Sequence, residues 1–250
     1  MKLVTAVSIL ALAAPLALSA QEEEKPAGGY IYATYFYCDT ATQEQADELV
    51  MKNSAPIYDA AVADGTIKGW GWLAHHTGGK WRRIQYHASD TIEGLLTAQE
   101  TLQQRSEAAG VSNDGFAQIC GAHDDYIWKS EVGNTLEILR GKAALSVYEV
   151  CDTTREERAL EIVKTLFAPI MDKAVADGKL TSWGWSSHVL GGEYRALETM
   201  TAKDFGTLMK TRAEIIEAIY GDGDNAVANE YSAICGSHAD YLWEIQHEKR

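Results

Sequence analysis

The sequence predicts an α+β fold in which one β-α-β-β-α-β unit occurs twice. The main observation is a repeat: Ile67–Arg82 returns 113 residues later as Leu180–Arg195, and both segments follow the motif Ala-Val-Ala-Asp-Gly. A second observation is that four cysteines fall two to a unit in matching places. A third is that β-forming runs alternate with capped helical segments in the same order in both units.

Each unit begins with a strand and a helix. An aromatic, β-forming run predicts a strand over Tyr30–Cys38, with its copy over Ala143–Cys151. The capping-box signal at Thr40–Gln43 then predicts a helix that ends near Asp64. Pro56 lies inside this helix, so we expect a kink or the start of a second helix there.

A hairpin, a second helix and a last strand complete each unit. The pairs Gly78-Gly79 and Gly191-Gly192 are signals of two-residue turns. The second helices are expected to begin near Asp90 and Thr201, and loops are expected after them. The last strands are expected over two segments, about Asp124–Val132 and Ala239–Gln246.

These patterns divide the chain into five parts. Lys2 followed by an apolar run and small residues predicts a signal peptide over residues 1–20, and residues 21–29 read as a disordered leader. Residues 30–133 form the first unit, 134–142 a connector and 143–250 the second unit. The protein is therefore expected to be exported, either periplasmic or secreted, with no membrane anchor.

Composition argues against two classes of partner. The chain has 250 residues, of which 46% are apolar and 23% charged, which is typical of a globular protein. Its formal charge of −14 becomes about −15 when the leader with Lys2 is removed. An acidic protein is poorly suited to nucleic acid and to anionic membrane surfaces.

Two β-α-β-β-α-β units in one chain resemble the dimeric α/β-barrel superfamily, in which two ferredoxin-like units pack sheet against sheet with helices outside. The resemblance rests on element order and duplication and covers nearly all of the mature chain. It implies a pseudo-dimeric barrel, able to work as a monomer, with a cavity between the sheets. Members include cofactor-free monooxygenases, haem enzymes such as chlorite dismutase, lactone isomerases and stress-response proteins.

The four cysteines predict two disulfides, because the protein is expected in an oxidising compartment. Three pairings are possible in principle. In a ferredoxin-like sheet of strand order 4-1-3-2, the end of the first strand meets the start of the fourth. That order selects Cys38–Cys120 and Cys151–Cys235. Metal ligation by these thiols is the weaker alternative, since no Cys-x-x-Cys spacing exists.

Strand alternation sorts each hairpin into two faces, and we assign the tryptophan-bearing face to the barrel interior. The glycine of each Trp-Gly-Trp motif then faces the helices. Core packing alone also explains tryptophans in strands, and a slip of one residue exchanges the faces. On this assignment the candidate ligand-binding residues are Trp70, Trp72, Arg83, Gln85, Trp183 and Trp185.

Histidines and carboxylates give weaker signals. His87 and Glu198 are the candidate acid/base groups, because the assigned inner face has few other titrating side chains. His75 and His123 recur in the second unit, but outer strands separate them and no metal-ligand spacing exists, so we predict no metal site. No cofactor is predicted, and haem is an alternative.

Three functions are compatible with these sequence patterns. The leading hypothesis is binding of a small apolar or aromatic molecule between the sheets. An alternative is a cofactor-free monooxygenase- or isomerase-like enzyme. The third is a structural or stress-related envelope protein whose barrel is filled. Further oligomerisation is left open.

Overall fold

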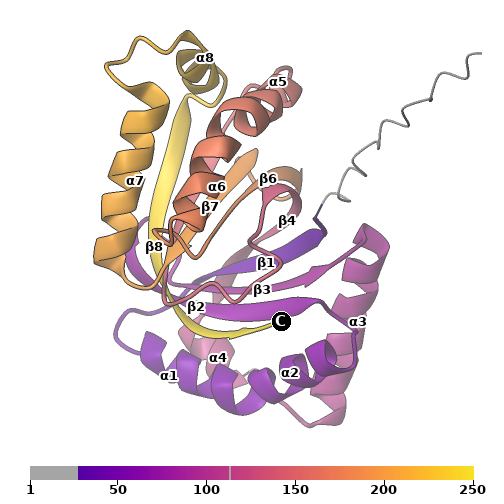
Figure 1. The fold of residues 1–250 in the computed structure, drawn as a ribbon. Helices are drawn as coiled ribbons and strands as arrows, with labels where there is room; N and C mark the ends of the chain where they lie inside the picture. The colour runs from indigo at the N-terminus through magenta and orange to yellow at the C-terminus, as the bar shows by residue number, and fades with distance from the viewer. Residues whose placement is uncertain (1–27, 113) are drawn as a thin grey trace, which may run out of the picture.

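The computed structural model describes residues 28–112 and 114–250, and its strands close into one antiparallel barrel (Figure 1). The order around the barrel is β1-β3-β2-β8-β5-β7-β6-β4. Each half of the chain thus contributes four neighbouring strands in the predicted 4-1-3-2 order. The strands are β1 (Tyr30–Tyr37), β2 (Gly69–Gly78), β3 (Arg83–Ser89), β4 (Ala122–Gly133), β5 (Ala143–Val150), β6 (Ser182–Leu190), β7 (Ala196–Ala202) and β8 (Ser237–Lys249).

Two seams join the halves of the barrel. β2 pairs with β8 and β4 pairs with β6, both antiparallel and both with register shifts along their length. The pairing leaves no free sheet edge among the described strands, which removes a site at which another chain could add a strand. Closure therefore depends on both halves.

The helices form one layer on each side of the barrel (Figure 1). The first layer holds α1 (Gln43–Leu49), the π-helical turn η1 (Val50–Ser54), α2 (Ala55–Ala63), α3 (Ile92–Ala108) and α4 (Asp114–Ile119). The second layer holds α5 (Glu156–Ile162), η2 (Val163–Phe167), α6 (Ala168–Ala176), α7 (Phe205–Tyr220) and α8 (Ala226–Ile234). No described helix is both long and apolar enough to cross a bilayer.

Some helix boundaries differ from the prediction. α4 and α8 occupy segments that we expected to be loops. α7 begins after Asp204 rather than near Thr201, because β7 runs to Ala202 and the Asp204 carboxylate accepts the N–H of Thr207 at 2.7 Å. The predicted capping box is absent from α1, whose N-cap Thr42 makes no side-chain cap bond. The predicted signal peptide, residues 1–20, lies outside the described residues.

The hairpins have the predicted register but the opposite orientation. Trp72 pairs with Gln85 as expected. However, Trp70 and Trp72 face the helices, and the indole N–H of Trp72 donates to Asp47 of α1 at 2.7 Å. Gly71 faces the barrel interior, where a Cβ would lie 2.5 Å from the ring of Tyr86. The glycine therefore makes room for an aromatic ring inside the barrel, and not for a helix.

Aromatic side chains fill the barrel interior, which corrects the expected inter-sheet cavity. Tyr35 stacks on Trp81 with ring centroids 4.3 Å apart, and Trp128 and Trp243 are fully buried in the same cluster. The recess that remains between the sheets measures about 50 Å³. That is room for one or two water molecules, whereas small-molecule sites have several hundred Å³. The described barrel interior is therefore too full for such a ligand.

Both predicted disulfides are confirmed. Cys38 is bonded to Cys120 and Cys151 to Cys235, across sequence separations of 82 and 84 residues. Each links the end of the first strand of a half to the start of its last strand. Two disulfides indicate an oxidising environment.

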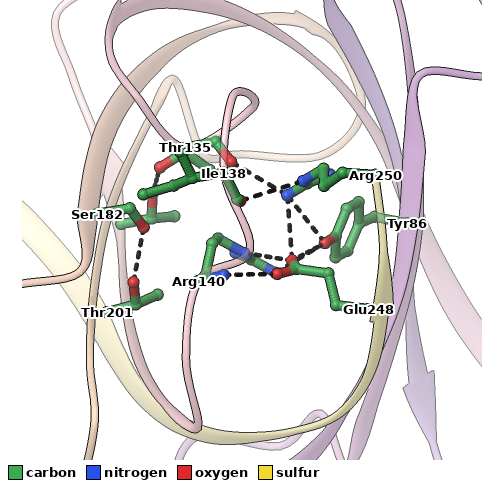
Figure 2. A network of polar contacts seen from close by, with 9 residues as sticks. Tyr86, Thr135, Ile138, Arg140, Ser182, Thr201, Glu248 and Arg250 are labelled. Carbon is green, nitrogen blue, oxygen red and sulfur yellow. Dashed lines mark hydrogen bonds and ion pairs between the residues drawn. The ribbon is translucent and has the colours of Figure 1, made fainter.

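A buried ionic network holds the connector, residues 134–142, against β8 (Figure 2). Arg140 donates through Nε to Glu248 at 2.6 Å, and its backbone N–H donates to the same carboxylate at 2.7 Å. Arg250 and the hydroxyl of Tyr86 also donate to Glu248. The side chains of Arg140 and Glu248 are only 6% and 5% exposed. This network closes one end of the barrel.

Replacing Arg140 should destabilise the fold strongly. Arg140→Ala leaves the Glu248 carboxylate buried without its main partner, and breaking a buried pair in this way typically costs about 3–5 kcal/mol. The measurement is the free energy of unfolding in urea. Arg155→Ala is the matched control, because the side chains of its bridge to Glu230 are 39% and 33% exposed and such a solvated pair should contribute about 1 kcal/mol or less. Equal losses in the two variants would contradict this role for the network.

Candidate functional site

A cavity of about 530 Å³ lies between the outer face of the first half's sheet and helices α1–α4. Side chains from β1, β3 and β4 form its floor, and residues of α1, η1, α2, α3 and α4 form its walls. This volume is in the range of small-molecule sites. The cavity is on the helix-facing side of the sheet, so the candidate site lies outside the barrel.

Polar and apolar side chains line different parts of this cavity. Gln85 of β3 makes a hydrogen bond with the hydroxyl of Tyr58 on α2. Phe36 and Phe116 supply an aromatic wall, with ring centroids 5.1 Å apart in an edge-to-face arrangement. Leu102 adds an aliphatic surface. The other amide and hydroxyl groups come from the helices: Asn53, Ser54, Gln99, Gln103 and Ser106.

The π-helical turn η1 provides one wall. Its backbone bond runs from the N–H of Ala55 to the carbonyl of Val50, one residue longer than an α-helical bond. Pro56 follows at once, and because proline has no N–H it cannot continue the regular pattern. Val50, Asn53 and Ser54 all line the cavity. The kink that the sequence predicts is therefore realised as a widened turn beside the cavity.

The same space is filled in the second half of the chain. Phe167 stands 113 residues after Ser54, and Ile219 stands 113 residues after Ser106. Both are buried in the hydrophobic cluster between the second sheet and its helices. The ring of Phe167 packs on that of Tyr231 with centroids 4.7 Å apart. Bulky side chains thus occupy the positions at which the first half has serines.

Burial changes the titration of groups near the cavity. It raises the pKa of Tyr58 to about 12, so this hydroxyl remains a hydrogen-bond donor at neutral pH. Burial lowers the pKa of His87 to about 4, so this imidazole is neutral. His87 stacks on Tyr32 with ring centroids 5.5 Å apart. Its Nε2 atom has no hydrogen-bond partner among the described residues.

The predicted ligand-binding residues lie on the helix-facing side, in two separate groups. In the first half only Gln85 lines the 530 Å³ cavity. Arg83 is held by the Asp47 carboxylate, with its Nε atom 2.6 Å away, and so anchors α1 to the sheet. In the second half Trp183 donates to Asp172, and Trp185 lines a smaller cavity of about 210 Å³. The ligand contacts of this set stay a prediction.

The structure does not bring the two catalytic candidates together. His87 is on β3 in the first half, whereas Glu198 is on β7 in the second half. Burial raises the pKa of Glu198 to about 7, and the Arg212 guanidinium opposes the rise. Neither residue lines the 530 Å³ cavity, so their catalytic role stays a prediction.

Metal ligands do not converge on the cavity in the described chain. The Nε2 atom of His75 donates to the carbonyl oxygen of Gly78 at 2.6 Å, and His123 pairs with Asp125 at 3.3 Å. Among the described residues, potential metal ligands come together at Glu149, Cys151 and Cys235. The two sulfurs are bonded to each other, and a disulfide leaves no thiolate to bind a metal.

Sequence reasoning missed the helical part of the site. Asn53, Ser54, Gln99 and Ser106 were not singled out, because only the strands were compared between the two units. A comparison along the helices would have found them, since Leu166, Phe167, Arg212 and Ile219 stand at the matching positions. The useful signal is a polar residue in one copy against a bulky residue in the other.

Comparison with known proteins identifies the fold alone. No family model matches the chain, and no curated protein matches it. Among solved structures, a putative monooxygenase from Fusobacterium nucleatum has a TM-score of 0.58 at 9% identity, covering 90% of this chain and 95% of that one. A putative monooxygenase from Lactobacillus acidophilus has a TM-score of 0.57 at 8% identity, covering 88% and 95%.

A third similar structure is a putative chlorite dismutase, with a TM-score of 0.52 at 10% identity, covering 88% of this chain and 95% of that one. These likenesses place the chain among α/β-barrel folds. At such low identity they transfer no residue role.

The cavity's side chains fit haem poorly. Haem needs an axial ligand and a broad apolar slot. The imidazole that lines the cavity belongs to His123, which is half exposed and paired with Asp125. Amides, hydroxyls and the Glu107 carboxylate occupy much of the remaining wall.

The buried imidazole of His87 should make stability depend on pH. An unfolded histidine takes up a proton near pH 6.5, but folded His87 does so only near pH 4, so stability should fall as pH drops through this window. His87→Met, which copies the second half's Met200, should remove about 2–3 kcal/mol of the fall between pH 7 and pH 4.5. Urea unfolding at a series of pH values measures this.

His76→Met is the matched control, because His76 is an exposed residue at the end of β2. Its profile should follow that of the native protein. Identical pH profiles for His87→Met and the native protein would show that His87 is not held neutral by the fold.

Proposed function

We propose that this protein binds a small molecule in the cavity between the first half's sheet and helices α1–α4. The observation that carries the proposal is the asymmetry between the copies: Ser54 and Ser106 border an open space, and Phe167 and Ile219 fill the matching one. A cavity that only reflected imperfect packing would lose stabilising contacts and be under pressure to fill. Keeping it open in one copy favours a ligand.

The lining indicates the chemistry of that ligand. Phe36 and Phe116 favour an aromatic or flat apolar face. Gln85, Gln99 and Tyr58 offer neutral donors and acceptors. Glu107 is a carboxylate at the wall, so an anionic ligand is disfavoured. We propose a neutral or weakly cationic aromatic compound that carries hydrogen-bonding groups.

The wider setting is also part of the proposal. We propose that the chain is exported, that it consists of two fused ferredoxin-like units, and that these units make a pseudo-dimer able to act as a monomer. The two disulfides support export, because such bonds persist in oxidising compartments. The 4-1-3-2 strand order in both halves supports the fusion.

Ser54→Phe should abolish binding by filling the cavity with the residue that the second half uses. We expect affinity to fall at least about tenfold, because the phenyl ring takes volume that the ligand needs. The measurement is the ligand-induced rise in melting temperature across a panel of aromatic amides, phenols and amines, followed by calorimetric titration of the compounds that raise it.

Lys52→Phe is the matched control, since Lys52 is on the same turn but is exposed and does not line the cavity. It should bind like the native protein. Equal binding by Ser54→Phe and the native protein would contradict the proposed site.

A second candidate function is catalysis of the cofactor-free oxygenase or isomerase kind. The observation in its favour is Glu198, a buried carboxyl whose pKa near 7 suits proton transfer at neutral pH. The similar structures described as monooxygenases agree with it at the level of fold. The acid/base group would then be Glu198 or His87, and the reaction would take place in either half.

Variants of these two residues test catalysis separately from binding. Glu198→Gln or His87→Ala should lower turnover of a bound compound by about 100-fold or more while its affinity is retained. Oxygen uptake and product analysis by mass spectrometry measure turnover. Turnover that is unchanged in both variants would eliminate them as acid/base groups. A ligand bound without turnover would favour the binding function.

A further inference from the structure

The two disulfides occupy matching places but have different neighbours. Phe36 lies two residues before Cys38, and Glu149 lies at the matching position two residues before Cys151. Alternation along a strand puts both of these side chains on the helix-facing side. The first disulfide therefore has an aromatic ring beside it, and the second has a carboxyl group.

The carboxyl group lies close to both sulfurs of the second disulfide. An oxygen of Glu149 and the Sγ atoms of Cys151 and Cys235 all lie within 4.8 Å of one another. Tyr231 of α8 donates its hydroxyl to Oε2 of Glu149 at 2.5 Å, and this holds the carboxyl in place. α8 ends at Cys235, whose N–H is bonded to the carbonyl of Tyr231 at 2.8 Å. One short element thus positions both the acid and a sulfur.

The two sulfurs differ in their access to solvent. Cys151 lines the cavity of about 210 Å³ beside the turn end of the β6–β7 hairpin. Cys235 is only 6% exposed. An incoming thiolate from solvent therefore reaches Cys151, and the sulfur that leaves is that of Cys235. A thiolate leaving into a buried site needs a proton, because an unpaired buried charge is costly.

Glu149 is able to supply that proton at neutral pH. Burial, followed by the charge of Glu198, raises its pKa to about 8, so the carboxyl is protonated at pH 7. Tyr231 and Trp185 act in the opposite direction through hydrogen bonds. The polar and titratable groups that face Glu149 come from five elements: Trp185 (β6), Glu198 (β7), His238 and Asp240 (β8), Tyr220 (α7) and Tyr231 (α8).

We propose that Cys151–Cys235 is a redox-active disulfide that exchanges with dithiols, and that Glu149 is the proton donor to the leaving sulfur of Cys235. Phe36 provides no such donor to Cys38–Cys120, which we assign a purely structural role. The proposal concerns the second half of the chain and is independent of ligand binding in the first.

The exchange balances in two displacements. The thiolate of a dithiol attacks Sγ of Cys151, the protein S–S bond breaks, and Cys235 leaves and takes the proton of Glu149. The second thiol of the reductant loses its proton to water. The resulting thiolate attacks the reductant's other sulfur, which is bonded to Cys151 in the mixed disulfide. Cys151 is released and is protonated by water, and Glu149 regains a proton from solvent. The dithiol is oxidised by two electrons, and the protein disulfide is reduced by two.

The test compares the two disulfides within one molecule. The full chain is treated with dithiothreitol between pH 6 and pH 9, free thiols are trapped by alkylation, and peptide mass spectrometry gives the reduction rate of each disulfide. The fraction of dithiothreitol that is ionised changes with pH but multiplies both rates equally, so it drops out of their ratio. At pH 7 Cys151–Cys235 should be reduced at least about tenfold faster, as expected for a positioned proton donor.

Burial alone predicts similar rates, because Cys120 and Cys235 are 4% and 6% exposed and their partners Cys38 and Cys151 are both partly buried. The rate ratio should fall as pH rises above about 8, where Glu149 loses its proton. In Glu149→Gln the ratio should approach one and should not change with pH. Glu161→Gln, an exposed acid on α5, is the matched control and should keep the native ratio.

Two results would overturn the proposal: a ratio near or below one in the native protein at pH 7, or a native-like ratio and pH profile in Glu149→Gln. Glu149→Phe, which copies the first half, provides a second variant with the same expected loss. If neither variant folds, the pH dependence of the ratio in the native protein decides the question by itself. A ratio that is constant from pH 6 to pH 9 would refute a role for Glu149.

Discussion

Closure of the barrel around a solid aromatic core is the constraint on which the rest of the structure depends. Rings from both halves, among them Tyr35, Trp128 and Trp243, occupy the interior. The Arg140–Glu248 pair closes one end. The packed interior stabilises the fold and leaves only about 50 Å³ of space. Sites for ligands or reactants must therefore form on the outer faces of the sheets, under the helices.

The two halves use that outer region differently. In the first half, serines and amides surround an open cavity. In the second half, Phe167 and Ile219 fill the equivalent space. Strand β5 of that half carries Glu149 beside a disulfide, at the position where β1 of the first half carries Phe36. The proposed fusion of two like units would explain this pattern, because one outer face is free to specialise while the shared core maintains the fold. The features that differ between the copies are those most informative about function.

Element order, hairpin register and both disulfides were predictable from the sequence, because each depends on local spacing or on duplication. The orientation of the sheet was not. Both faces of the Trp-Gly-Trp hairpins are apolar, so alternation separates the faces without showing which one is inside. We assigned the face that carries Gly71 to the helices, and this was wrong. The missing Cβ of Gly71 makes room for Tyr86 inside the barrel. The cavity was missed because its walls come from helices, and the side chains that leave it open, such as Ser54 and Ser106, have bulky counterparts only in the second half.

The most direct test of the account is hydrogen–deuterium exchange of the protein with and without a bound aromatic compound. We predict slower exchange over residues 49–58 and 99–107, the two helical segments that supply most of the first half's cavity wall. We predict no change over residues 162–171 and 212–220, where the second half is filled. Protection confined to the second half of the chain, or equal protection of both halves, would contradict the placement of the functional site outside the barrel in the first half.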